Sequence, residues 1–363
     1  MYYYRIAEVV LQSCYRLLSF DAFECEPVRA DITLDMTNEL PPPRSDQILG
    51  IMYLRRLDNG YFFHFQDSAE KGLYVSADYS RLHMLGITKP ALARMDEWFV
   101  RVAVECMLAR KGYVSLHAAA VEVEGEAFAF TGPSGAGKST RANAMRDELG
   151  AKMVSGDRPL IDVKHLELYG VPWDGEEQCF RNVHYPLKAI CEVRRAKSVY
   201  VRAMSFAQRR KLLMRQCFLP MWDTETAAIQ MANISRLATS ANMVRLFSGP
   251  TGEDVRALYN AIQGHQELKG EETDIKAKAG YILRKIKDES ILTPMGDNIK
   301  KYNGTVLLNE VSALVWEKLQ KPVSRDDLLK AILDEYEVEE DVAAADLDAL
   351  LEKLKGFGVI EED

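Results

Sequence analysis

One stretch of the chain combines glycines, a lysine and hydroxyl side chains at a spacing suited to phosphate binding. Residues 126–140 read EAFAFTGPSGAGKST, and they match the pattern G-x-x-x-x-G-K-[ST]. Glycines let the backbone amides of such a loop point inward at phosphate oxygens. We therefore expect the loop to bind ATP or another nucleoside triphosphate. The residues of this site are Gly132, Pro133, Ser134, Gly135, Ala136, Gly137, Lys138, Ser139 and Thr140.

The polar residues of the loop have expected tasks. Lys138 would reach the β- and γ-phosphates, and Ser139 would hold Mg²⁺. An alternating apolar run precedes the loop and predicts a strand, while residues 140–149 are compatible with a helix. That helix would direct its partly positive amino end at the same anion.

Two further residues could take part in phosphoryl transfer. Asp157 follows the loop at a Ser-Gly-Asp kink, where it could hold Mg²⁺ or accept the proton of an attacking hydroxyl. His117 lies in the strand-like run YVSLHAAAV, beside the strand that leads to the loop. A histidine that only completes the core is the alternative at this position.

These residues must be positioned by a larger α/β architecture. Residues 1–90 alternate apolar and polar positions around turns such as Asn59-Gly60 and predict a β-rich region. Residues 91–263 predict the core, which opens with a helix that ends at Gly112. Residues 264–274 are polar and predict a linker. Residues 275–363 predict strands, three helices and a terminal strand, a small winged-helix-like unit.

Composition excludes several classes of protein. With 363 residues and 47% hydrophobic content, the chain is long enough for two or three domains with real cores. It has neither a signal-peptide pattern nor an apolar run of transmembrane length, so we expect a cytoplasmic protein that does not bind membranes. The six cysteines form no C-x-x-C pair, which favours buried free thiols over disulfides or a zinc site.

The negative charge is concentrated in the C-terminal quarter. Residues 281–363 contain 11 Lys+Arg and 19 Asp+Glu, which accounts for the whole net charge of −8. Nucleic acid would require the opposite sign on a winged-helix-like unit, so we expect no nucleic-acid partner.

The core resembles the HPr kinase/phosphorylase superfamily, in particular the HPr-kinase-related kinases found beside peptide-modification genes. The resemblance rests on SLHAAAV with His117, on GPSGAGKST, and on VSGDRPLI with Asp157. It implies an HPr-kinase/PEP-carboxykinase-like P-loop kinase core in which histidine and aspartate frame the γ-phosphate and the acceptor hydroxyl, with the aspartate as base. The bacterial enzyme has two adjacent aspartates here, whereas this chain has Gly156 and Arg158 around Asp157.

The same resemblance implies a third magnesium ligand and self-association. The turn-rich loop PWDGEE corresponds to the family's later magnesium-binding glutamate, and Glu177 is the candidate. The expected metal ligands are therefore Ser139, Asp157 and Glu177. Because the family enzyme is an oligomer, a homo-oligomer is also implied.

The C-terminal unit resembles the PqqD family of peptide chaperones for ribosomally synthesised and modified peptides (RiPPs). TVLLNEVSALVWEKL, the following helix pair and LKGFGVI carry this likeness. It implies that the unit holds the leader of a precursor peptide as an extra strand on an exposed sheet edge.

Together the two resemblances predict a peptide kinase that transfers the γ-phosphoryl group of ATP to a serine or threonine hydroxyl of a precursor peptide. Two alternatives remain open. One is a kinase of a small molecule such as free serine, with the last domain serving assembly. The other is a nucleotide-gated peptide chaperone that hydrolyses ATP without phosphorylating the peptide.

Overall fold

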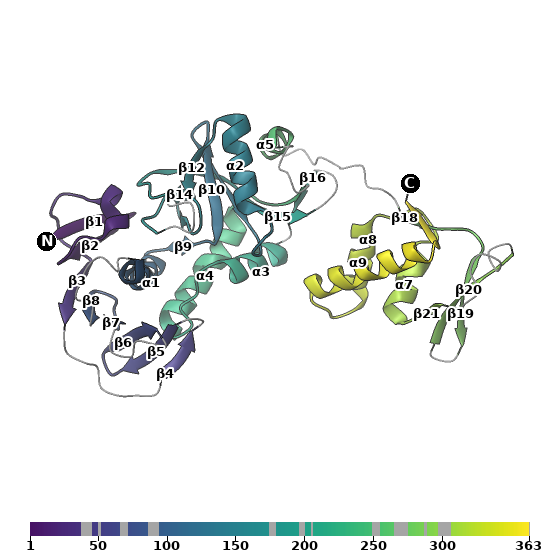
Figure 1. Cartoon of the computed structure of the whole chain (residues 1–363), viewed down its shortest axis with the longest axis horizontal. Helices are drawn as coiled ribbons and strands as arrows, with labels where there is room; N and C mark the ends of the chain where they lie inside the picture. Colours follow the sequence, from purple (N-terminus) through teal and green to yellow (C-terminus); the bar gives the residue numbers. More distant parts are fainter. Residues whose placement is uncertain are drawn as a thin grey trace. The chain divides into compact units, whose positions relative to one another are not determined.

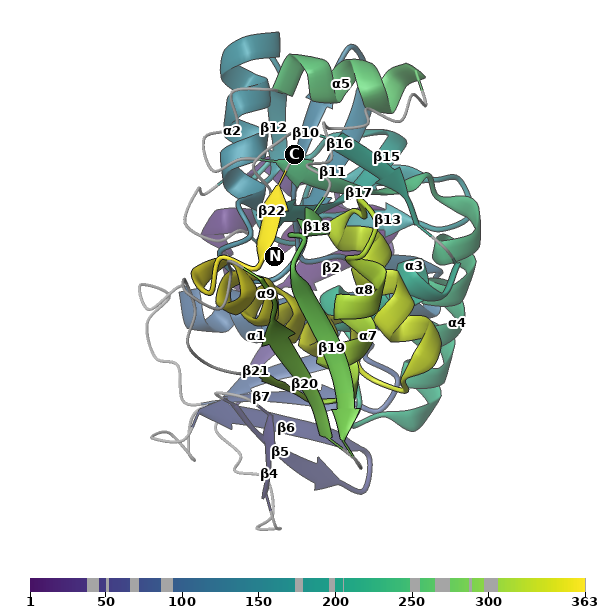
Figure 2. The ribbon, with the colours of Figure 1, turned by 90° about the vertical axis from the view of Figure 1, so that its right-hand side faces the viewer.

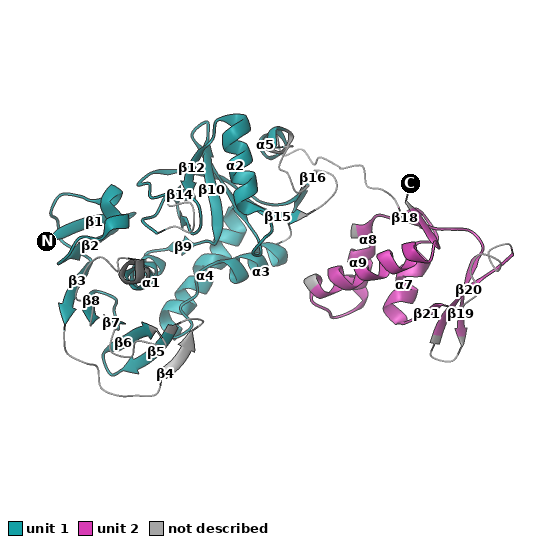
Figure 3. Cartoon of the chain, viewed as in Figure 1, with its two compact units in different colours: residues 1–268 teal, residues 269–363 magenta. Residues whose placement is uncertain are grey.

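The chain divides into two compact units, Met1–Leu268 and Lys269–Asp363 (Figure 3). Each unit has its own hydrophobic core and is described by itself. The computed structural model describes residues 1–37, 46–49, 52–65, 72–85, 94–173, 179–195, 200–204, 206–248, 255–264, 275–286, 289–296 and 306–362.

A β-rich region opens the first unit, as the alternating sequence predicts. Its turn at Asn59 joins two antiparallel strands, with Leu57 paired to Gly60, so the hairpin prediction is confirmed. Within the described residues, eight strands form one sheet in the following order: β1 (Tyr2–Ile6), β2 (Val9–Ser13), β3 (Ile32–Thr37), β8 (Arg81–Leu85), β7 (Gly72–Ser76), β6 (Gly60–Phe65), β5 (Met52–Leu57) and β4 (Asp46–Leu49).

One face of this sheet packs on the helix α1 (Arg94–Arg110) (Figure 1). Phe99, Val102 and Cys106 of this helix are buried in the same core as strand residues. The chain turns at Gly112, whose φ of 93° is a left-handed conformation that glycine adopts without strain. The predicted helix end is therefore confirmed.

A second, mixed sheet forms the centre of the first unit. Its path runs β12-β10-β11-β15-β14-β13-β9, and β17 pairs with both β15 and β16. The strands are β9 (Tyr113–Ser115), β10 (Ala118–Val123), β11 (Glu126–Thr131), β12 (Lys152–Ser155), β13 (Leu160–Asp162), β14 (Glu167–Tyr169), β15 (His184–Arg195), β16 (Tyr200–Ala203) and β17 (Met243–Ser248).

Helices cover both faces of this sheet (Figures 1 and 2). The helices α2 (Lys138–Leu149) and α5 (Val255–Gly264) share one core with Phe128 and Phe130. The helices α3 (Phe206–Gln216) and α4 (Thr224–Ser240) share the opposite core with alternate positions of the same strands, including Ala127 and Ala129. The alternation of strand side chains thus produces a three-layer α/β arrangement.

In the residues of the second unit that the structure describes, the predicted strands and three helices are present. A three-stranded sheet has the order β19 (Tyr281–Ile286), β20 (Glu289–Pro294) and β21 (Val306–Leu308), and β18 (Ile275–Ala277) pairs with β22 (Ile360–Glu362). The helices are α7 (Glu310–Lys318), α8 (Arg325–Glu335) and α9 (Glu340–Gly356). Trp316 is buried in their common core, and Ser324 caps α8 by accepting from the Asp327 amide.

Candidate functional site

The topology of the central sheet brings the predicted site residues to one edge. Strand β10 runs antiparallel to both of its neighbours, β11 and β12. The amino end of β10 therefore lies beside the carboxyl ends of β11 and β12. His117 precedes β10, the glycine-rich loop (residues 132–137) follows β11, and Asp157 follows β12. Three segments that are separate in the sequence meet at this edge.

The glycine-rich loop has the backbone that a phosphate cradle requires. Gly132, Gly135 and Gly137 have φ values of 144°, 76° and 94°, which side-chain-bearing residues rarely adopt. A Cβ added at Gly137 would also lie 2.0 Å from Nη1 of Arg141. The strand, loop and helix order that the motif predicts is therefore confirmed.

The helix α2 begins directly at Lys138, two residues before the predicted start. The first amides of a helix have no partner within the helix, and with the helix dipole they favour an anion. Ser139 and Thr140 are exposed at this end, as are Pro133 and Ser134 in the loop. These residues fit a triphosphate, since donors and hydroxyls are gathered where its charge would lie.

Lys138 folds back over the loop that precedes it. Its Nζ donates to the carbonyl oxygens of Gly132 at 3.2 Å and Pro133 at 3.3 Å. Burial lowers the pKa of Lys138, and the negative charge of Asp157 opposes that decrease. The ammonium group thus lies in a partly desolvated position between the loop and the acidic residue.

His117 and Asp157 are in contact, with His117 Nε2 3.4 Å from Asp157 Oδ1. Both side chains are about one third exposed, at 33% and 30%. The Ala118 amide donates to the Asp157 carbonyl at 2.7 Å, which fixes the two segments to each other. The Thr131 hydroxyl donates to the His117 carbonyl at 2.8 Å and ties this pair to the strand that leads into the loop.

The protonation of His117 depends on its neighbours. Burial lowers the pKa of His117, and the positive charge of Lys138 lowers it further. The charge of Asp157 opposes these effects, and so does a hydrogen bond between the ring and the Gln216 side chain. A lowered pKa leaves the imidazole neutral at pH 7, where it can accept a proton or a hydrogen bond.

The structure differs from the sequence prediction in the local setting of His117. The residue lies between β9 and β10 rather than inside one strand. Its amide donates to the carbonyl of Gln216, the last residue of α3, at 2.8 Å. The break in the strand exposes part of the imidazole at the sheet edge, whereas a histidine within a fully covered strand would be buried.

The expected metal ligands are brought together only in part. Asp157 follows β12, and Ser139 lies in the first turn of α2, directly after the loop at the same sheet edge, whereas Glu177 lies outside the described residues. In the described part of the chain, no three His, Cys, Asp or Glu side chains are grouped to hold a metal ion. Mg²⁺ in nucleotide sites is held by one or two carboxylates together with phosphates, so Asp157 and Ser139 fit that ion in a nucleotide complex.

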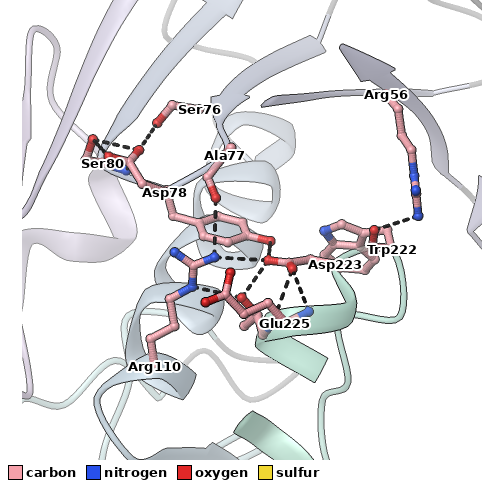
Figure 4. A network of polar contacts seen from close by, with 11 residues as sticks. Arg56, Ser76, Ala77, Asp78, Ser80, Arg110, Trp222, Asp223 and Glu225 are labelled. Carbon is pink, nitrogen blue, oxygen red and sulfur yellow. Dashed lines mark hydrogen bonds and ion pairs between the residues drawn. The ribbon is translucent and has the colours of Figure 1, made fainter. Parts of the chain in front are cut away.

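Within the first unit, a polar network connects the β-rich region to the start of α4 (Figure 4). The Tyr79 hydroxyl, from the turn between β7 and β8, donates to Asp223 Oδ2 at 2.9 Å. Arg110 of α1 lies 3.2 Å from the same carboxylate oxygen and donates to the Thr226 hydroxyl at 2.8 Å. Asp223 also caps α4 by accepting from the Glu225 and Thr226 amides. These hydrogen bonds and the ion pair join the β-rich region and α1 to the start of α4 within the first unit.

Sequence reasoning missed two residues beside the site, Gln216 and Glu192. Gln216 reaches His117 from the end of α3. Glu192 lies on β15, paired in register with Thr131 at the start of the loop. Glu192 could have been noticed in the sequence, because it is an acidic residue directly after the apolar run LKAIC. The sequence around Gln216 has no feature that would indicate a position beside the site.

Comparisons with known proteins identify part of the second unit. Residues 296–360 match the family model described as Coenzyme PQQ synthesis protein D (PqqD). No curated protein matches the chain. Among the solved structures that match is TbiB1 in complex with the TbiA(beta) leader peptide, at 22% identity and a TM-score of 0.21, covering 24% of this chain and 94% of TbiB1.

No helix among the described residues is long and apolar enough to cross a membrane. The expected likeness of the C-terminal unit is confirmed by the family match. Residues 296–360 constitute a PqqD-like domain within the C-terminal unit of a mixed α/β protein.

Proposed function

We propose that this protein is an ATP-dependent kinase that phosphorylates a serine or threonine hydroxyl of a ribosomally synthesised precursor peptide. One observation carries the proposal. The His117–Asp157 pair, 3.4 Å apart, lies at the same sheet edge as the glycine-rich loop and Lys138. A phosphate cradle beside a carboxylate is the arrangement that phosphoryl transfer to a hydroxyl needs.

The residues at this sheet edge have different proposed roles. Amides of the loop and of the first turn of α2 bind phosphate oxygens, while Lys138 neutralises charge on the β- and γ-phosphates. Ser139 and Asp157 would hold Mg²⁺, which supplies further neutralisation of the phosphates when it is bound. Neither role requires a residue outside this edge.

Asp157 also receives the proton of the acceptor. As the hydroxyl oxygen forms its bond to the γ-phosphorus, the bond to the bridging oxygen of ADP breaks, and the hydroxyl proton passes to the Asp157 carboxylate. His117 holds that carboxylate through the 3.4 Å contact and is neutral at pH 7 because its pKa is lowered. A neutral imidazole does not compete with the acceptor as a proton donor to Asp157.

The PqqD-like domain supplies the peptide. Strand β21 is the last strand in the order β19-β20-β21, and its Leu307 is 62% exposed while Val306 and Leu308 are buried. An added peptide strand could pair with such an edge and cover Leu307. Because the domain and the loop belong to one chain, peptide binding raises the local concentration of the acceptor hydroxyl.

The proposal is tested with the full chain, Mg-ATP and the precursor peptide encoded beside its gene. Mass spectrometry should show one added phosphoryl group on the core of the peptide, and removal of the leader should slow the reaction. Asp157→Asn should abolish the product. The matched control is Asp147→Asn, an exposed aspartate of α2 whose ion pair is with Arg146, and it should leave the rate unchanged.

Other outcomes would replace the proposal. Phosphorylation of free serine at a rate independent of the leader would identify a small-molecule kinase. Steady ATP hydrolysis with bound but unmodified peptide would identify a nucleotide-gated chaperone.

A further inference from the structure

Arg158 is the residue after Asp157, and backbone pairing places it directly opposite His117. Two hydrogen bonds, of 3.1 and 2.7 Å, run from the amides of residues 116 and 118 to the carbonyls of residues 159 and 157. They continue the antiparallel register of β9 and β13. The His117 amide points away from this pairing, to the Gln216 carbonyl. His117 and Arg158 are therefore a non-hydrogen-bonded pair, the arrangement in which opposite side chains lie closest on the same face.

The guanidinium group of Arg158 lies beside the proposed base. Arg158 Nε is 3.9 Å from Asp157 Oδ2, whereas His117 Nε2 is 3.4 Å from Asp157 Oδ1. A charge-assisted hydrogen bond would be about 2.7–2.9 Å long, so the arginine forms a loose ion pair. Among the residues that the structure describes, the guanidinium makes this ion pair and no hydrogen bond. An arginine that served only to hold Asp157 would be expected at hydrogen-bonding distance.

The charge of Arg158 acts on other groups at the same sheet edge. Burial is the main cause of the lowered pKa of His117, and the charges of Lys138 and Arg158 lower it further. Burial raises the pKa of Cys217, directly after α3, and the charge of Arg158 opposes that increase. The Arg158 side chain is 26% exposed, so it remains accessible to a ligand.

The charges around Asp157 suit a phosphoryl group in transfer. That group carries negative charge on three oxygens, and Lys138 supplies a single point charge from the loop. A guanidinium group adds N–H donors in a planar fork that matches phosphate oxygens. Because Arg158 is next to the carboxylate that accepts the hydroxyl proton, this second cation lies on the acceptor side of the site.

We infer that Arg158 is a catalytic residue that donates N–H groups to the γ-phosphoryl group during its transfer from ATP to the acceptor hydroxyl. The acceptor oxygen bonds to the γ-phosphorus, the bond to the bridging oxygen of ADP breaks, and the proton passes to Asp157. Arg158 binds the non-bridging oxygens of the phosphoryl group during this step. The inference rests on the proposed kinase function and adds to it a residue that lies outside the loop motif.

The test measures phosphorylation of the precursor peptide and binding of nucleotide by the full chain. Arg158→Ala should lower kcat about 10²- to 10³-fold, the range for removing one preorganised donor from developing charge. The magnesium complex of AMPPNP, a non-hydrolysable ATP analogue, reports binding in isothermal titration calorimetry. Its affinity should fall less than about threefold, because the loop and Lys138 hold the nucleotide before transfer.

Added guanidinium chloride distinguishes a catalytic from a structural arginine. At concentrations too low to unfold the protein, guanidinium ion should restore part of the kcat of Arg158→Ala, because it can occupy the place of the missing group. Sodium chloride at equal ionic strength should not. Arg158→Lys keeps the charge but loses the fork and should have an intermediate kcat.

A control variant and a stability measurement complete the design. Arg146→Ala removes an exposed arginine of α2 that pairs with Asp147, and it should keep the wild-type kcat and show no response to guanidinium. Urea denaturation of each variant measures its stability. If Arg158→Ala does not fold, Arg158→Gln, which keeps most of the side-chain volume, gives the same comparison of kcat with AMPPNP affinity.

The outcomes separate this inference from the proposed function. Wild-type protein that binds AMPPNP but never forms phosphopeptide would refute the kinase function and the inference with it. Wild-type phosphorylation with unchanged kcat in Arg158→Ala would overturn the inference alone. So would parallel losses of kcat, AMPPNP affinity and stability without rescue by guanidinium, which would make Arg158 a structural partner of Asp157. A raised KM for the peptide with unchanged kcat would assign Arg158 to acceptor binding and would also overturn it.

Discussion

His117 Nε2 lies 3.4 Å from Asp157 Oδ1, and the two backbones are joined by the hydrogen bond from the Ala118 amide to the Asp157 carbonyl. The contact exists because β10 is antiparallel to β12, so the start of one strand meets the end of the other. Lys138 influences the pKa of His117 across the same edge.

Replacing His117 should slow phosphoryl transfer without weakening nucleotide binding. We expect His117→Ala to reduce kcat by about 10²-fold or more, the range typical of groups that assist proton transfer, because Asp157 loses its partner. Rates with Mg-ATP and peptide, together with a separate AMPPNP titration, measure the two effects. His165→Ala is the control, since His165 pairs with Asp162 away from the loop. Equal loss of nucleotide affinity in His117→Ala would indicate a structural histidine.

The charge of Lys138 should be visible in the titration of His117. The positive charge lowers the pKa of His117, so Lys138→Met should raise that pKa toward its ordinary value of about 6.5. Nuclear magnetic resonance of the imidazole across pH 4–9 measures this shift, and Lys152→Met, at an exposed lysine, should leave it unchanged. A constant His117 pKa in Lys138→Met would show that the two groups do not interact.

The lowered pKa also predicts how stability depends on pH. Because His117 binds protons less readily in the folded state, the unfolded state gains protons first as the pH falls below about 6.5. The contribution of His117 to stability should therefore be lost between that pH and the lower folded-state pKa. Urea denaturation of wild type and His117→Ala at several pH values should show a smaller acid loss in the variant.

Gly137 should tolerate no side chain. Its φ of 94° costs a residue with a Cβ about 1–2 kcal/mol, and the new Cβ would displace the Arg141 guanidinium. We expect Gly137→Ala to lose stability and nucleotide affinity. Gly150→Ala at the far end of α2 is a matched control, because its φ is 68° and no atom lies within 4 Å of the added Cβ. Gly150→Ala should lose stability but keep its nucleotide affinity. Loss of nucleotide affinity in both variants would show that the effect of Gly137→Ala on binding is not specific to the loop.

The network around Asp223 should contribute to the stability of the first unit. Tyr79→Phe removes one donor to a buried carboxylate and should lower the free energy of unfolding by about 2 kcal/mol, within the range for hydrogen bonds to charged groups. Tyr74→Phe removes an exposed hydrogen bond to the Asn59 carbonyl and should cost far less. Urea denaturation measures both values. Equal values for the two variants would contradict a special contribution of the network.

Leu307 should contribute to peptide binding and little to folding. It is 62% exposed on β21, so Leu307→Glu should leave thermal unfolding unchanged while weakening the binding of a fluorescent leader peptide about tenfold or more. Val342→Glu places the same charge at a 52% exposed position on α9 and should not affect binding. A general charge effect on the acidic unit would instead weaken binding equally in both variants.

The loop and the separate C-terminal unit could be predicted from the sequence because their signals are local. The motif is contained in one short stretch of sequence, which holds the glycines, the lysine and the start of the following helix. The structure shows the expected backbone conformation for this stretch. The alternating runs predict the strands on either side of Gly125, which pair as β10 and β11. The family match to residues 296–360 supports the likeness expected for the C-terminal unit.

The contacts between residues that are distant in the sequence were decided by the tertiary structure. His117 was predicted within a strand, but it lies in a break that the end of α3 stabilises through Gln216. Glu192 and Arg245 meet because β15 and β17 are parallel neighbours, and the pairing of strands distant in sequence leaves no local pattern.

The sequence by itself determined the cradle-like backbone of the glycine-rich loop and the start of the helix after it, because φ preferences and helix starts depend on neighbouring residues. Only the tertiary structure decided which side chains face that cradle, because strand order fixes which loops share a sheet edge. His117 and Asp157 lie beside the loop because β10 is antiparallel to both β11 and β12.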